Sequence, residues 1–263
     1  MQTQRALAPL VMLFGLMLTA CGSGSETPLA MKSVEGGALA DSVPDGMKPM
    51  TLLEAAAYQG VPTDVAAEAM HKYDMFKDRV TSHLYISIID FSQHSGHMRY
   101  YMINTKTGAV DAIPVAHGSG SDPHATGLPQ LFSNRLNSKM TSLGAYIVNE
   151  KMNSSKHGTA ARLDGLESTN SNARERAIIL HSATYVKAGN AKQGMSWGCP
   201  AIPTGWIRTA LDRLSGGTFM YAFGRGTSSN SLIDDLEFVE GASLNPAHAI
   251  LNDGDMAPID GEW

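Results

Sequence analysis

The side chains best suited to chemistry lie in residues 181–203, whose sequence is HSATYVKAGNAKQGMSWGCPAIP. His181 opens the segment and follows the apolar residues 177–180. Such a run is typical of a short buried strand, and we expect His181 at the C-terminal end of that strand. Cys199 lies between a glycine and a proline, in a turn that can present its thiol and bring backbone N–H groups together. A thiol, a base and oxyanion donors favour nucleophilic acyl transfer.

Cys199 needs a base, because a free thiol titrates near ~8.5 and only the thiolate is a good nucleophile. Neutral His181 can accept the proton, and the resulting ion pair would keep the sulfur charged. We expect Gly198 and Cys199 to supply the oxyanion N–H groups. Ser196 and Trp197 are candidate substrate contacts, although Ser196 could instead brace the loop and Trp197 could simply pack. A small buried cysteine and a structural histidine are the alternatives.

The order of His181, a loop and then Ser-Trp-Gly-Cys at residues 196–199 resembles the catalytic motif of the L,D-transpeptidase (YkuD-like) family, in its murein L,D-transpeptidase branch. The resemblance extends over about residues 85–224. It implies a β-sandwich-like domain that acts on peptidoglycan stem peptides, with the histidine oriented by a backbone carbonyl. Ser182 occupies the matching position, so it becomes a candidate catalytic residue.

Two departures from the family pattern concern the substrate contacts. Ser182 stands where the family has glycine, and residues 200–203 stand where it has an arginine shortly after the cysteine. An arginine there could hold a substrate carboxylate. Its place could be taken by Arg162, Arg174 or Arg176, and the sequence does not choose among them.

A metal site is the main chemical alternative, because several histidines fall in predicted loops: His94, His97, His117, His124 and His157. However, the sequence contains no HExxH motif and no paired CxxC, and zinc sites rely on such spacing. We therefore expect no metal and no other cofactor. His117 and His157, each followed by glycine, are better candidates for residues that line the substrate site, with a structural loop role as the alternative.

Residues 1–20 predict an export signal, because Arg5 is their only charged residue and the apolar run 7–18 is too short for a permanent span. Leu-Thr-Ala-Cys at residues 18–21 resembles a lipobox, which predicts lipidation of Cys21. An ordinary signal peptide with a coincidental cysteine is the alternative. The lipid would anchor a periplasm-facing lipoprotein in the cell envelope, and Gly22 after the cysteine favours the outer membrane. Lipidation would leave Cys199 as the remaining one of two cysteines, which favours a reactive role.

The chain as a whole is predicted to have a mixed, β-rich α+β fold. Helical periodicity is found at residues 52–58, 63–76 and 204–214, and strand-like runs are found at residues 84–91, 98–103, 109–116, 145–148 and 218–223. The predicted segments are a signal peptide (1–20), a flexible lipid-anchored linker (21–50), a helical accessory segment (51–80), a catalytic domain (81–225) and an acidic tail (226–263).

Net charge excludes one class of partner. The chain has 20 Lys and Arg residues against 25 Asp and Glu, with a formal charge of −5. It shows no basic stripe, so nucleic acid is not an expected partner. The sequence does not indicate an oligomeric state.

Three functions remain. In a murein L,D-transpeptidase, Cys199 would attack a stem peptide and pass the acyl group to an amine. In an L,D-carboxypeptidase or endopeptidase, water would take that group. The third is a non-catalytic lipoprotein that binds peptidoglycan, which the intact pair of His181 and Cys199 disfavours. The first two differ only in the final acceptor, so the sequence does not separate them.

Overall fold

The computed structural model describes residues 51–229. The predicted export signal, Cys21, the linker up to residue 50 and the predicted tail from residue 230 lie outside these residues. Among the helices of residues 51–229, none is both long and apolar enough to cross a membrane.

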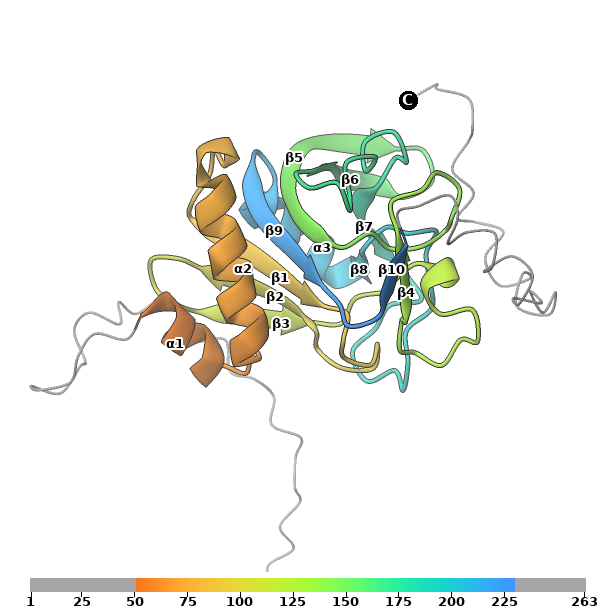
Figure 1. Ribbon diagram of the computed structural model, residues 1–263, viewed down its shortest axis with the longest axis horizontal. Coiled ribbons are helices and arrows are strands. Elements are labelled where there is room, and N and C mark those ends of the chain that lie inside the picture. Colours follow the sequence, from red (N-terminus) through yellow and green to blue (C-terminus); the bar gives the residue numbers. More distant parts are fainter. Residues whose placement is uncertain (1–50, 230–263) are drawn as a thin grey trace, which may run out of the picture. The chain divides into compact units, whose positions relative to one another are not determined.

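Eight strands form one hydrogen-bonded sheet (Figure 1), in the order β3-β2-β1-β9-β5-β6-β7-β8. Neighbours are antiparallel except for the parallel pairs β1–β9 and β7–β8. The strands are β1 (Tyr85–Asp90), β2 (Tyr100–Asn104), β3 (Val110–Ile113), β5 (Gly144–Ser154), β6 (Gly158–Gly165), β7 (Ile179–Ala183), β8 (Ala201–Pro203) and β9 (Thr218–Phe223). The predicted β-rich fold with few helices is therefore confirmed.

The sheet curves around one of its two main cores. Ile113 on β3 and Ile202 on β8 lie at opposite ends of the strand order, yet they belong to the same buried cluster. Helix α3 (Ile207–Leu214) closes this cluster with one buried face, after a 3₁₀ turn at Thr204–Trp206. The two edges of the sheet thus enclose a common core, and β7 and β8 form one wall of it.

A second, two-stranded sheet joins β4 (Leu131–Ser133) and β10 (Thr227–Ser229) in parallel. Strand β10 lies inside the segment that the sequence predicted as a tail from residue 226. Its pairing with β4 shows that the first residues of this segment are part of the fold.

Helices α1 (Leu52–Tyr58) and α2 (Thr63–Phe76) cover the other face of the sheet, where α2 lies across β1 and β9 (Figure 1). Val65 and Ala69 of α2 are buried in a cluster with Phe219 of β9. The Tyr221 hydroxyl also donates a hydrogen bond to Glu68. Helix α2 therefore supplies part of the core.

The N-terminus of α2 differs from that of α1. The residue before the helix is Pro62, and no side chain caps the N-terminus. The ring fixes the backbone of Pro62 without a side-chain acceptor. In α1, by contrast, Thr51 and Glu54 form a capping box.

The buried face of α2 predicts a stability effect. Val65 is 1% exposed, whereas Met75 on the same helix is 58% exposed. Val65→Ala should lower the free energy of unfolding by about 2 kcal/mol, because it removes buried methyl groups and leaves a cavity. Met75→Ala, the matched control, should stay within about 0.5 kcal/mol of the wild type. Urea unfolding measures both, and equal effects would show that α2 does not pack on the sheet in solution.

Candidate active site

Strand pairing brings Cys199 to the strand that carries His181. Strands β7 and β8 run parallel with His181 opposite Ala201, and Cys199 lies in the loop two residues before β8 begins. The backbone N–H of His181 donates to Pro200 O at 3.4 Å. The expected position at the end of the strand was wrong, because β7 starts at Ile179 and His181 is its central residue.

The His181 ring is 1% exposed, and its Nδ1 lies 3.0 Å from Ser182 O. A carbonyl only accepts, so Nδ1 carries the proton and Nε2 is the basic nitrogen. This is the contact that the family resemblance implied for Ser182. Burial, together with the charge of His157, lowers the pKa of His181 to about 4, against the effect of the Ser182 hydrogen bond. The imidazole is therefore neutral at pH 7.

His157 also belongs to this site. It lies in the turn between β5 and β6, where its backbone N–H donates to Ser154 Oγ at 3.2 Å. The rings of His157 and His181 are tilted by 40°, with their centroids 4.0 Å apart. The β5–β6 turn thus places a second imidazole, partly exposed, against the candidate base.

Cys199 is partly exposed and packs against the first core with its apolar side. Its thiol lies 3.8 Å from Ala177 O, a distance that suits a weak S–H hydrogen bond. Ala177 has a φ of 53°, in the left-handed region that non-glycine residues rarely adopt. Residues 177 and 178 are therefore not part of the strand, which begins at Ile179. The turn at Ala177 directs its carbonyl toward the thiol of Cys199.

Ser196 braces the loop of the nucleophile. Its hydroxyl donates to Cys199 O at 2.6 Å and accepts from Gly198 N–H at 3.1 Å, and the residue is 1% exposed. These contacts are the loop bracing that the sequence offered for Ser196, and a substrate contact by Ser196 stays a prediction. The Gly198 N–H is bonded within the loop, and its oxyanion role also stays a prediction. The oxyanion role of Cys199 N–H stays a prediction.

Trp197 lies on the partly exposed side of the same loop. The ammonium of Lys139 lies 4.4 Å from the centroid of its ring, a cation–π contact. Whether Trp197 contacts substrate stays a prediction.

His117 is fully buried, so it does not line an accessible surface. Its Nδ1 accepts from Arg99 Nη2 at 2.8 Å, because a guanidinium only donates, and its Nε2 lies 3.5 Å from Asp122 Oδ2. Burial lowers its pKa to about 4. The backbone of His117 accepts the Ser196 N–H at 2.9 Å. The prediction of a substrate-lining His117 is replaced by a structural role beneath the loop of the nucleophile.

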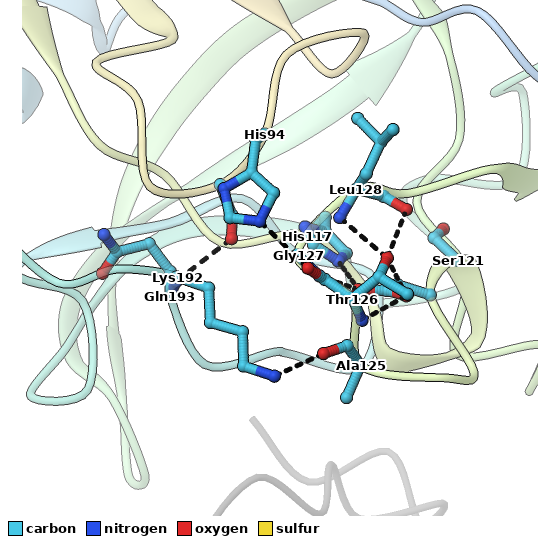
Figure 2. A network of polar contacts seen from close by, with 12 residues as sticks. His94, His117, Ser121, Ala125, Thr126, Gly127, Leu128, Lys192 and Gln193 are labelled. Atoms are coloured by element: carbon cyan, nitrogen blue, oxygen red, sulfur yellow. Dashed lines mark hydrogen bonds and ion pairs between the residues drawn. The ribbon is translucent and has the colours of Figure 1, made fainter.

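Figure 2 shows how polar contacts extend from His117 to the loop between β7 and β8. Lys192 donates to Ala125 O, and the Gln193 N–H donates to Ser95 Oγ at 3.0 Å. His94 accepts from Gly96 N–H through Nδ1 and lies 2.9 Å from Thr126 O through Nε2. Both nitrogens of His94 are thus engaged in loop contacts. Within residues 51–229, no three His, Cys, Asp or Glu side chains gather into a group that could hold a metal ion.

The structure distinguishes the three candidate arginines. Arg174 pairs with Asp164 and with Glu150, and Arg162 also pairs with Glu150. Arg176 instead lies against the loop of the nucleophile. Its contacts run to residues 133–142. Nothing in the local sequence pattern of that segment indicates that it lies near the loop 196–199.

The backbone of Gly198 gives a testable requirement. Its φ is +124°, and a Cβ there would lie 2.8 Å from Met140 O and 3.1 Å from Arg176 Nη2. Gly198→Ala should therefore displace the loop and slow iodoacetamide reaction of Cys199 several-fold at neutral pH. Gly189→Ala is the matched control, because its φ is +86° with no heavy atom within 4 Å of the added Cβ. Equal rates in the two variants would contradict the proposed contact.

Most of the described chain matches a known protein family. Residues 57–223 match the family model described as L,D-transpeptidase catalytic domain (YkuD_2). This range includes all of α2. No curated protein matches the chain.

Several solved structures are similar to the chain at low identity. An L,D-transpeptidase from Mycobacterium smegmatis is 12% identical, with a TM-score of 0.34, and the match covers 53% of this chain and 58% of that one. L,D-transpeptidase 3 from Mycobacterium tuberculosis is 14% identical, with a TM-score of 0.34 and coverage of 53% and 61%. An L,D-transpeptidase from Stackebrandtia nassauensis is 14% identical, with a TM-score of 0.36 and coverage of 64% and 68%. The chain thus spans less than two thirds of the length of the two mycobacterial proteins.

The family match covers more than half of the 263 residues and includes both His181 and Cys199. The chain therefore belongs to the L,D-transpeptidase catalytic domain family.

Proposed function

We propose that the chain is a cysteine-dependent L,D-transpeptidase that acts on peptidoglycan stem peptides. The observation that carries this proposal is the family match over residues 57–223, which include both His181 and Cys199. The pairing of His181 with Ala201, two residues after Cys199, supports it. The neutral imidazole, with Nε2 as its basic nitrogen, suits a general base for the thiol.

The proposed reaction has two balanced steps. In the first, the proton of Cys199 moves to His181 Nε2, and the sulfur attacks the carbonyl of a diaminopimelate–D-alanine bond. The C–N bond breaks, the imidazolium returns its proton to the leaving amine, and D-alanine departs from a thioester. In the second step an acceptor amine attacks the thioester, His181 takes its proton, and the thiol is regenerated as the new amide forms. The backbone N–H of Cys199 is the proposed oxyanion donor.

Muropeptide products test the proposal. The purified chain is incubated with disaccharide tetrapeptides, alone and with a second muropeptide as amine acceptor, and the products are read by mass. Release of D-alanine with cross-linked dimers supports transpeptidation. Release of D-alanine with only tripeptide monomers would identify a carboxypeptidase, and cleavage of preformed dimers an endopeptidase. A product pattern identical to that of Cys199→Ala would contradict any cysteine-dependent activity and leave a peptidoglycan-binding lipoprotein.

We further propose that the protein is a periplasm-facing lipoprotein of the cell envelope, anchored through Cys21 in the outer membrane. The lipobox at residues 18–21 supports this. Cys21→Ala should move the protein from the membrane fraction to the soluble fraction. If the variant stays membrane-bound after its signal is removed, the anchor assignment is wrong.

A further inference from the structure

Arg176 holds its guanidinium against the loop of the nucleophile through neutral acceptors. Nη1 donates to Ser133 O at 2.9 Å and to Ser142 Oγ at 3.1 Å. Nη2 donates to Ser138 Oγ at 3.3 Å and to Met140 O. A Cβ on Gly198, the neighbour of Cys199, would lie only 3.1 Å from Nη2. The charge is therefore fixed in place beside the nucleophile.

The described part of the chain gives this charge no carboxylate partner. Among the ion pairs of residues 51–229, none involves Arg176, whereas Arg174, two residues earlier, pairs with two carboxylates. An enclosed cation without a counter-charge is unfavourable, and burial accordingly lowers the pKa of Arg176. The groups whose negative charge would favour the guanidinium are Tyr146 and Cys199.

Tyr146 does not supply that negative charge at neutral pH. Its hydroxyl is buried and lies 2.6 Å from Ser142 Oγ, and burial raises its pKa to about 12. Cys199 is therefore the one of the two groups that can be anionic near pH 7. Its thiol contacts Ala177 O, on the residue directly after Arg176.

His181 does not fill the role of the cation. Burial lowers its pKa to about 4, so an imidazolium there is a poor counter-charge for a thiolate at pH 7. The ring of His157 stacks on that of His181, with the centroids 4.0 Å apart. The ammonium of Lys139 lies over the Trp197 ring, 4.4 Å from its centroid. The guanidinium of Arg176 is thus a fixed positive charge beside the loop that carries the thiol.

We propose that Arg176 is a positioning residue whose charge stabilises the Cys199 thiolate when the thiol proton moves to His181. The S–H bond breaks, an N–H bond forms at Nε2, and no further reactant is needed. The inference rests on the proposed use of Cys199 as the nucleophile. Arg176 also bonds residues 133–142, so its charge and its bracing of that loop must be separated by experiment.

The test is the pH profile of iodoacetamide reaction of Cys199 in the full chain, which needs no muropeptide substrate. Arg176→Gln keeps an amide donor but removes the charge, and it should raise the apparent pKa of the thiol by about one to two units, slowing alkylation about 10- to 100-fold below that pKa. Arg176→Lys keeps the charge and should stay near the wild type. Arg174→Met is the matched control for net charge and should not shift the profile.

Melting curves separate charge from loop bracing. Both Arg176 variants lose loop hydrogen bonds and should melt earlier than the wild type, yet only Arg176→Gln should shift the thiol profile. An unshifted profile in Arg176→Gln, or an equal shift in Arg176→Lys, would overturn the proposal. If Arg176→Gln does not fold, the pH profile of iodoacetamide reaction in His181→Gln provides the test. The proposal requires its profile to stay near the wild type, and a shift of one unit or more overturns it. A protein that passes these tests but turns over no muropeptide would refute the proposed function alone.

Discussion

Cys199→Ala should abolish muropeptide turnover while the domain stays folded. The thiol is the proposed site of the covalent intermediate, and its replacement by a methyl group removes the nucleophile. Because Cys199 is partly exposed at the margin of the first core, the melting temperature should change little. The measurement is product release by mass, beside a melting curve. Residual cross-linking at the wild-type rate would exclude Cys199 as the nucleophile.

His181→Gln should lower turnover about 10²–10⁴-fold, the usual contribution of a general acid–base group. The loss should not add to that of Cys199→Ala, because the two residues act in one step. Alkylation of the thiol should persist, since iodoacetamide requires only a thiolate. Turnover by His181→Gln at the wild-type rate would contradict this shared step.

The pH profile of turnover follows from the base. Burial lowers the pKa of His181 to about 4, so its base form is present at neutral pH and is lost only as the pH falls through about 4. Turnover should therefore fall toward acid pH with a limb near 4, below the ordinary histidine value of about 6.5. A limb at 6.5 would show that the imidazole is solvated in the working enzyme.

Arg99→Met should cause a large loss of stability. Arg99 is fully buried, and Nε and Nη2 donate to Val115 O at 3.2 and 2.8 Å. Nη1 donates to Gln93 O at 2.7 Å. The guanidinium also donates to His117 and lies 5.1 Å from the centroid of the Phe91 ring. Its replacement strands several buried acceptors at once.

The expected loss is about 3–5 kcal/mol in the free energy of unfolding, the usual effect of breaking a buried charged network from one side. Burial lowers the pKa of Arg99 to about 9, against the charges of Asp90 and Asp122, so the group is still charged at pH 7. Arg174→Met, an exposed arginine with two carboxylate partners, should cost at most about 1 kcal/mol. Urea unfolding compares the two, and similar losses would contradict the stabilising role of the buried network.

Sequence alone was sufficient for features that depend on local order. Apolar periodicity predicted α1, α2 and the strands β1, β2, β3 and β9 within a few residues, because each pattern repeats over a single element. It found only the start of β5 and did not predict β4, β6, β8 or β10. The motif from His181 to Cys199 indicated the family, because four of its residues lie side by side in one loop. The contact between His181 and Ser182 O was implied by the family resemblance.

Tertiary structure decided which of these residues share a site. His117 and His157 look alike in sequence, each a loop histidine before a glycine. The β5–β6 turn carries His157 to the ring of His181, whereas His117 is enclosed by Arg99 and Asp122. Arg174 and Arg176 are likewise two residues apart on one turn, yet only Arg176 faces the loop of the nucleophile. Such differences arise from contacts between segments far apart in the chain, which no local pattern encodes.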